Sequence, residues 1–167
     1  MEQKKTNEAI SIKIHEIRVV SFFMKEPDLD LQKSFNEDLL RFEYGVNFSW
    51  DIPSNKFNVL LDGALMYNNE GQNLILLKCD CITTYIIKNL ASVLSIKDNT
   101  KFKMPTPLLA MLVGSAISHA RGALSEKTSG SFIHNYPIPL VNTQDFLKDL
   151  TAGNLTEEQQ KEKKTNK

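Results

Sequence analysis

The few residues that could do chemistry in this sequence begin with two cysteines, Cys79 and Cys81. They stand two apart, so on a β-strand both thiols would point to the same face. A zinc site would need further ligands, such as His119 or His134, and the spacing of paired Cys and His residues typical of zinc sites is absent. We therefore expect two buried structural cysteines and no metal site.

The other residues that could take part in catalysis stand alone. His15 has no partner at a recognisable spacing, and the sequence has neither a nucleophile elbow nor a glycine-rich phosphate loop. Arg121, which precedes Gly122, is expected to stabilise a helix end, where the helix dipole favours a cation. The sequence thus predicts no catalytic residue, no cofactor and no enzyme activity.

The overall composition excludes several classes of protein. The 167 residues include 20 Lys and Arg and 20 Asp and Glu, so there is no basic surplus for binding nucleic acid. No apolar stretch reaches the roughly 18 to 20 residues of a membrane span, and the polar N-terminus lacks the apolar middle of a secretory signal. Two cysteines do not make a disulfide framework. We expect a cytoplasmic protein that is not embedded in a membrane.

The chain divides into three segments. Residues 1–8 form a polar arm that we expect to be flexible, and residues 9–153 carry the patterned apolar residues of one folded domain. Residues 154–167 contain a single apolar residue, too few to offset the entropy of ordering them. We therefore expect a charged, disordered tail.

The first predicted strand starts as an alternation of isoleucines and polar residues over 10–14. The apolar residues then change parity and continue over 17–23, which places Phe23 on the same face as Val19. One inserted residue in a strand has this effect, so we predict a long first strand with a bulge near His15–Glu16.

The second predicted strand gives the cleanest pattern in the chain. Its apolar residues alternate with polar ones and form the Leu40–Trp50 row, which consists of Leu40, Phe42, Tyr44, Val46, Phe48 and Trp50. Two further strands are predicted over 57–67 and from Leu74 to about Tyr85, joined by a hairpin turn over 68–71. The last of them opens with four consecutive apolar residues and should be central in the sheet.

Beyond the strands the spacing becomes helical. Residues 90–96 are too few for a long helix, and 99–104 should form a loop. Thr106 can cap a long apolar helix, and Pro107 suits its first position. We expect this helix to end near Arg121-Gly122 or a turn later.

A flexible loop is predicted over 126–131, and a short last helix, capped by Thr143, over 144–150. The order of elements predicts an α+β fold, in which a four-stranded antiparallel sheet is followed by two helices packed on one face. Such a small sheet with an uncovered apolar face is predicted to oligomerise, as a homotetramer or failing that a dimer, with the first strand meeting another subunit.

This order of elements resembles the SecB-type protein-export chaperones. The best local match is the C-terminal third, where prolines precede an apolar helix that contains Ala120-Arg121-Gly122, and Pro139-Leu140-Val141-Asn142 leads into Phe146-Leu147. The start of the Leu40–Trp50 row resembles the apolar row on the second strand of that family. Together the resemblance covers about residues 10–150.

The resemblance implies a SecB-like holding chaperone that binds unfolded preproteins in long apolar grooves and passes them to the SecA motor. It also implies a homotetramer built as a dimer of dimers. Typical members are acidic and dock the basic tail of SecA by charge, whereas this chain is neutral, so we predict weaker binding to that tail. Divergent relatives serve other clients, including the antitoxins of toxin–antitoxin pairs.

A chaperone of this kind needs exposed apolar and aromatic surface. The candidate client contacts are Leu40, Phe42, Tyr44, Val46, Phe22, Phe23 and, on the facing extended segment, Tyr136. Phe42 and Tyr44 are the preferred residues among them. The alternative is that the Leu40–Trp50 row packs on the helices as core.

Three functions remain open on the sequence. The leading hypothesis is a chaperone that holds unfolded clients, for protein export or for the antitoxin of a toxin–antitoxin pair. The second is an oligomeric adaptor that binds one folded partner. The third is a small enzyme with a pocket where sheet and helix meet, which no constellation of residues supports.

Overall fold

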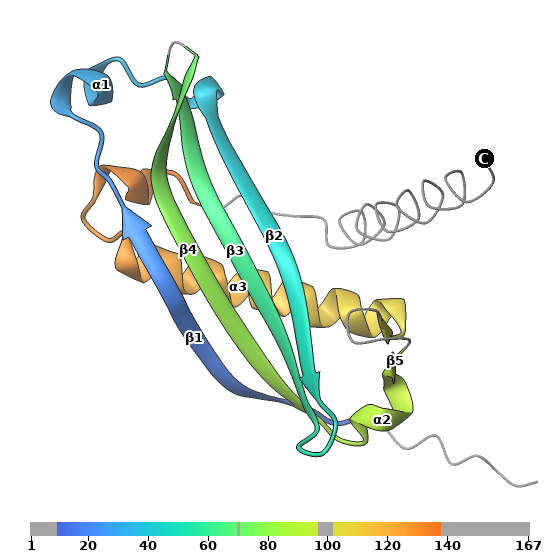
Figure 1. Cartoon of the computed structure of the whole chain (residues 1–167). Helices are drawn as coiled ribbons and strands as arrows, with labels where there is room; N and C mark the ends of the chain where they lie inside the picture. Colours follow the sequence, from blue (N-terminus) through green and yellow to red (C-terminus); the bar gives the residue numbers. More distant parts are fainter. Residues whose placement is uncertain (1–9, 70, 97–101, 138–167) are drawn as a thin grey trace, which may run out of the picture.

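The computed structural model describes residues 10–69, 71–96 and 102–137. Four long antiparallel strands form a twisted sheet, and one long helix runs across a single face of it (Figure 1). The strands are β1 (Ile12–Met24), β2 (Leu40–Asp51), β3 (Lys56–Asn69) and β4 (Gln72–Ile87), in the spatial order β1-β4-β3-β2. The predicted central position of the fourth strand is confirmed, and β1 and β2 are the edges of the sheet.

β1 has the predicted bulge and a second one. The register against β4 shifts at His15, as predicted, and again at Val20. The second bulge reverses the parity of the strand, so that Phe22 faces the long helix and Phe23 lies on the opposite face. The prediction that Phe23 shares the face of Val19 is therefore wrong.

β2, β3 and β4 form a meander with tight turns. Asn55 closes the first turn with a φ of 56°, and its side-chain Oδ1 accepts a hydrogen bond from the backbone N–H of Leu90 at 3.1 Å. Gly71 lies in the second turn with a φ of 87°, a conformation that costs glycine little. The Leu40–Trp50 row falls on β2 with unbroken period two, as the sequence predicts.

Short elements connect the strands to one another and to the long helix. They are α1 (Leu29–Lys33), η1 (Glu37–Leu39), α2 (Leu90–Val93), β5 (Ser95–Ile96), β6 (Phe102–Lys103) and η2 (Phe132–Asn135). β5 and β6 pair with each other, so the loop predicted over 99–104 contains a short strand. The segment 90–96 holds only a single helical turn, as expected from its length.

α3 (Thr106–Lys127) ends five residues past Gly122, close to the later of its two predicted ends. Its N-cap is Pro105, and Thr106 is already helical, so the predicted cap by Thr106 is wrong. The helix also continues past Gly122 to Lys127, and the predicted loop begins only at Thr128. A glycine costs a helix only about 1 kcal/mol, and burial of Leu124 against the sheet outweighs that cost.

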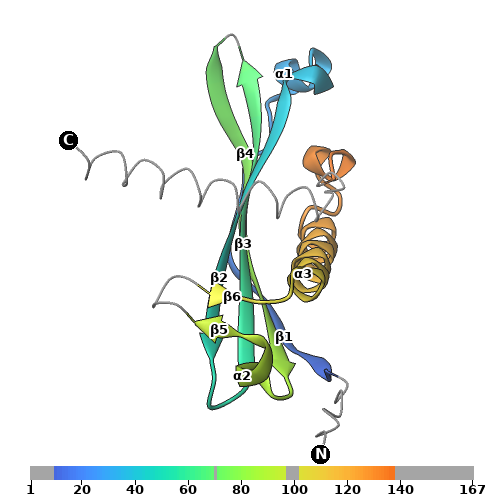
Figure 2. The same cartoon turned by 90° about the vertical axis from the view of Figure 1, so that its right-hand side faces the viewer.

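The side view shows α3 and η2 on one side of the sheet (Figure 2). The opposite face has none of the described helices on it (Figure 1). Leu112, Val113 and Ala116 of α3 are fully buried, and the hydroxyl of Tyr85 on β4 donates a hydrogen bond to the carbonyl of Leu112 at 2.8 Å. By length and composition alone α3 could cross a membrane, but core helices meet the same criterion, and its buried side packs on this sheet.

The predicted fold class is confirmed: this is an α+β structure with a four-stranded antiparallel sheet and a long helix on one face. The arm 1–8, the second predicted helix over 144–150 and the tail 154–167 lie outside the described residues.

Candidate functional site

The two cysteines lie on β4, in the interior between the sheet and α3. Cys79 and Cys81 are 4% and 2% exposed and are not bonded to each other. Burial, reinforced by the neighbouring Cys81 and Asp80, raises the pKa of Cys79 to about 11, so it is a neutral, unreactive thiol near pH 7. Within the described part of the chain, no three His, Cys, Asp or Glu side chains could together hold a metal ion.

His119 of α3 and His134 of η2 lie within hydrogen-bond distance of threonine hydroxyls, and not of the two cysteines. The Nδ1 atom of His119 lies 3.3 Å from Oγ1 of Thr83, and burial lowers the pKa of this histidine. The Nδ1 atom of His134 lies 3.3 Å from Oγ1 of Thr128, which donates its hydrogen to the carbonyl of Leu124 at 2.8 Å. A hydroxyl has one hydrogen, so His134 must donate from Nδ1 here. His134 therefore does not act as a base toward Thr128, and the hydroxyl of Thr83 beside His119 belongs to a residue that is only 1% exposed.

One end of the Leu40–Trp50 row is closed by aromatic packing. Phe102 of β6 lies 5.2 Å from Phe48 and 5.1 Å from Trp50, measured between ring centroids. Phe57, which is fully buried, completes this cluster at 5.6 Å from Phe102. Val46 packs against the same core. Val46, Phe48 and Trp50 are partly buried and pack against this core, so the position of Val46 does not favour it as a client contact.

The other end of the row lies beside a second aromatic cluster. Phe35, in the connection between α1 and η1, stacks on Tyr67 with ring centroids 4.5 Å apart. Phe35 also contacts Phe132 and Tyr136, each at 5.0 Å. Leu40 packs against this part of the core. Residues distant in the sequence, from the α1–η1 connection, β3 and the η2 segment, thus form one aromatic cluster beside the start of β2.

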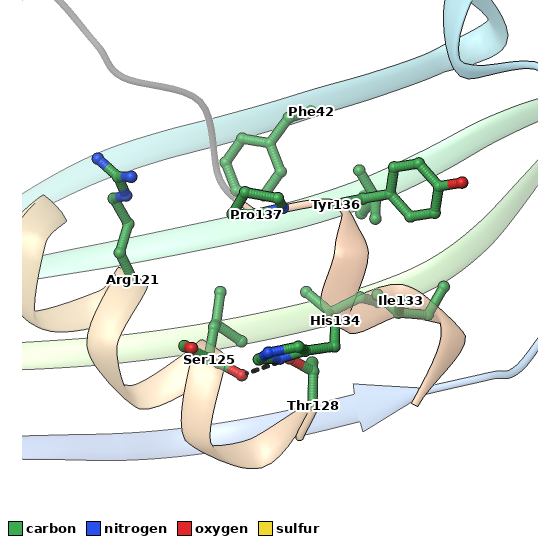
Figure 3. A pocket seen from close by; sticks show the side chains of 11 residues that line it. Phe42, Arg121, Ser125, Thr128, Ile133, His134, Tyr136 and Pro137 are labelled. Carbon is green, nitrogen blue, oxygen red and sulfur yellow. Dashed lines mark hydrogen bonds between the residues drawn. The ribbon is translucent and has the colours of Figure 1, made fainter. Parts of the chain in front are cut away.

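Between these two clusters the row is open, and Phe42 and Tyr44 line two adjoining cavities. Their ring centroids are 5.9 Å apart. The first cavity has a volume of about 40 Å³ and is lined by Phe42, Leu65, Leu77, Arg121, Leu124, Ser125, Thr128, Ile133, His134, Tyr136 and Pro137 (Figure 3). The second, of about 30 Å³, is lined by Phe42, Tyr44, Leu61, Asp62, Gly63, Cys79, Ile117, Ala120 and Leu124. We call the two together the β2–α3 groove.

A glycine helps to make the groove hollow. Gly63 on β3 pairs with Tyr44 on one side and Cys79 on the other, in the floor of the second cavity. A Cβ atom there would lie 3.0 Å from Cζ of Phe42, closer than an ordinary contact. The absence of a side chain at Gly63 therefore lets the Phe42 ring lie over the sheet and leaves room beside Tyr44.

The remaining candidate contacts lie away from the groove. Phe22 packs into the core near Leu77 and has the ammonium of Lys127 5.4 Å from its ring centroid. Phe23 is 50% exposed on the opposite face of the sheet. The structure thus brings Phe42, Tyr44 and Tyr136 of the predicted set together, and does not bring Phe22 or Phe23 to them.

The prediction that Arg121 stabilises a helix end is wrong. It lies in the interior of α3, six residues before the helix ends at Lys127, so it does not cap that end. Its side chain extends from α3 toward β2, on the side where Phe42 and Pro137 lie (Figure 3). With the helix end placed at Lys127, the sequence would have predicted that Arg121 lines the same surface as Leu124 and Thr128, because residues three and seven positions apart share one face of a helix.

No protein-family model matches this sequence, and no curated protein matches it. Among solved structures, the chain is similar to a SecB-like chaperone of Mycobacterium tuberculosis, in complex with a peptide from an antitoxin. That match has 13% sequence identity and a TM-score of 0.49, and it covers 78% of this chain and 90% of the other. A likeness of this degree does not by itself assign a function to the groove.

Proposed function

We propose that this chain is a holding chaperone of the SecB type, a non-enzymatic protein that keeps unfolded clients extended in the β2–α3 groove. The observation that carries the proposal is the open middle of the Leu40–Trp50 row. Phe42 and Tyr44 line apolar cavities there, while the residues on either side are closed by aromatic clusters.

The groove also lies along an unpaired strand edge. β2 pairs with β3 on one side, and no described strand pairs with its other side. An extended client can bond to the free backbone groups of such an edge while alternate side chains enter the apolar cavities. Binding through backbone and apolar contacts suits clients of unrelated sequence, because it requires no particular residue at most positions.

The uncovered side of β1 supports the proposal of an oligomer. Ile14 and Ile17 face the helix side of the sheet but are 45% and 46% exposed. Beside them a wide hollow runs between β1 and α3, lined by Ile17, Val19, Ser118, His119, Gly122, Ala123, Glu126 and Lys127. A second subunit packed here would cover this surface, consistent with a homodimer or a tetramer built as a dimer of dimers.

For the clients we propose preproteins in the cytoplasm that await export, and a transfer to SecA that the neutral charge of this chain weakens. The alternative client is the antitoxin of a toxin–antitoxin pair. A toxin–antitoxin pair encoded beside the gene would favour the second client, and its absence there would favour the first.

The test is suppression of aggregation of several unrelated unfolded proteins by the full chain. We expect Phe42→Ser and Tyr44→Ser to lose most of this activity with thermal midpoints lowered by only a few degrees. Phe23→Ser is the matched control, because Phe23 is an exposed aromatic on the other face of the sheet, and it should retain activity. Activity retained by both groove variants would contradict the proposal, as would binding of a single folded partner only.

A further inference from the structure

The charged groups that line the β2–α3 groove are few, and one of them, Arg121, has no ion-pair partner among the residues that the structure describes. Asp62 lines the second cavity, but its carboxylate accepts a hydrogen bond from Nδ2 of Asn47 at 3.3 Å and lies against Gly45, on the opposite face of the sheet. Arg121 in the first cavity takes part in neither of the two ion pairs found among the described residues, Glu16–Arg18 and Asp30–Lys33.

Arg121 is already partly buried in the free chain. Leu124 and Ile133, both buried, line the same cavity, and Phe42 lies above it from β2 (Figure 3). A wholly apolar client that covers this cavity would remove water from the guanidinium and would not replace the hydrogen bonds that the water accepts. Burying an unpaired cation costs several kcal/mol, whereas a carboxylate can accept two parallel hydrogen bonds from a guanidinium and offset that cost.

The hydroxyl groups that line the cavity differ in whether they can donate a hydrogen bond to a client carboxylate. The hydrogen of Thr128 Oγ1 is already donated to the carbonyl of Leu124. Ser125 lies one helical turn after Arg121, is exposed and lines the same cavity. On α3, the side-chain donors available to an incoming anion are therefore the N–H groups of Arg121 and the hydroxyl of Ser125.

We propose that the client segment held in this groove carries an Asp or Glu side chain within an apolar stretch, and that this carboxylate pairs with Arg121. The inference rests on the proposed chaperone function and names the chemistry of its preferred clients. An internal side chain is favoured over a chain-terminal carboxylate because the groove continues on both sides of Arg121, toward Tyr44 in one direction and toward Tyr136 in the other.

The test measures binding of short apolar peptides to the full-length protein by fluorescence anisotropy. Three peptides differ only at one central position, which is Asp, Asn or Lys, and each has a blocked C-terminus. We expect the Asp peptide to bind about tenfold more tightly than the Asn peptide, and the Lys peptide to bind most weakly. A fourth peptide has Asn at the centre and a free C-terminal carboxylate, and it should bind no better than its blocked form.

Arg121→Gln should abolish the preference for Asp over Asn, and Arg121→Glu should reverse it in favour of Lys. The control is Arg18→Gln on β1, which removes an equal charge away from the groove and should leave the preference unchanged. Equal binding of the three peptides by the natural chain, or a preference that survives Arg121→Gln, would overturn the inference, as would a gain confined to the free C-terminus.

The failure of this inference can be told from the failure of the proposed function. If all peptides bind equally and Phe42→Ser weakens them all, the groove holds clients without a charge preference, and only the role of Arg121 is wrong. If no peptide binds, or Phe42→Ser changes nothing, the groove is not the client site, and both proposals are contradicted.

Discussion

The two halves of the Leu40–Trp50 row have the same pattern in the sequence and different surroundings in the structure. Around Phe48 and Trp50 the row is covered by Phe102, which β6 brings over the sheet. Around Phe42 and Tyr44 the same face of the same strand lines open cavities. The difference teaches that period two fixes the face on which a side chain lies, while a short element elsewhere in the chain decides whether that face is covered.

The largest expected effect is in the closed half. Phe57→Ala removes a fully buried ring that contacts both Phe48 and Phe102, and should lower the free energy of unfolding by about 3–5 kcal/mol. Urea denaturation followed by circular dichroism measures this. A loss below about 1 kcal/mol would mean that the cluster is not core, and the contrast between the two halves would disappear.

The next prediction concerns the β1 side of α3, where we expect a second subunit, in contrast to the β2 side, where we expect the client. Ile17→Asp places a charge on the uncovered helix side of β1 and should raise the dissociation constant of the oligomer at least about tenfold. Native mass spectrometry and sedimentation at micromolar concentration measure this.

Ile75→Asp is its matched control. Ile75 is 45% exposed against 46% for Ile17, but it lies on β4 near the hairpin, so the assembly should persist. A natural chain that is only monomeric at micromolar concentration would contradict the oligomer and weaken the functional proposal with it.

Much of the fold follows from the sequence, because strand periodicity survives packing. The Leu40–Trp50 row and the bulge at His15 are confirmed since each depends on local parity. The second bulge at Val20 was not predictable, because residues 19–23 carry apolar side chains at both parities and fit either face equally well.

The candidate site could be predicted only in part. Phe42, Tyr44 and Tyr136 were recognised as exposed aromatic candidates, and the structure places all three around the groove. The helix-end role expected of Arg121 depends on an end near Gly122, whereas tertiary packing of Leu124 extends α3 to Lys127. The cover over Phe48 and Trp50 was missed because Phe102 lies in a strand of two residues, too short to give a pattern.

A further expected effect concerns the two thiols. Cys79 lines the second cavity, whereas Cys81 lies in the closed core. Burial raises the pKa of Cys79 from 9.0 to about 11, which lowers its thiolate fraction at pH 8 by about a hundredfold. Alkylation by iodoacetamide should therefore be slow, and it should rise with pH up to about 11, because the acid form is the one that burial favours.

Mass spectrometry of the alkylated chain can separate the two thiols. Cys79 should react before Cys81, and an apolar peptide in the groove should slow Cys79 alone. Faster reaction of Cys81, or no protection of Cys79 by a peptide that binds, would show that the second cavity is not part of the client site.

The central claim is that clients contact the open half of the row and not the closed half. The most direct measurement is photo-crosslinking, with a photoreactive phenylalanine analogue placed at Phe42 in one variant and at Phe48 in another. Each variant is irradiated with an unfolded client, after circular dichroism has shown that it is folded. We predict strong crosslinks from position 42 and few from position 48. Equal crosslinking from both positions, or crosslinking from position 48 alone, would contradict the account.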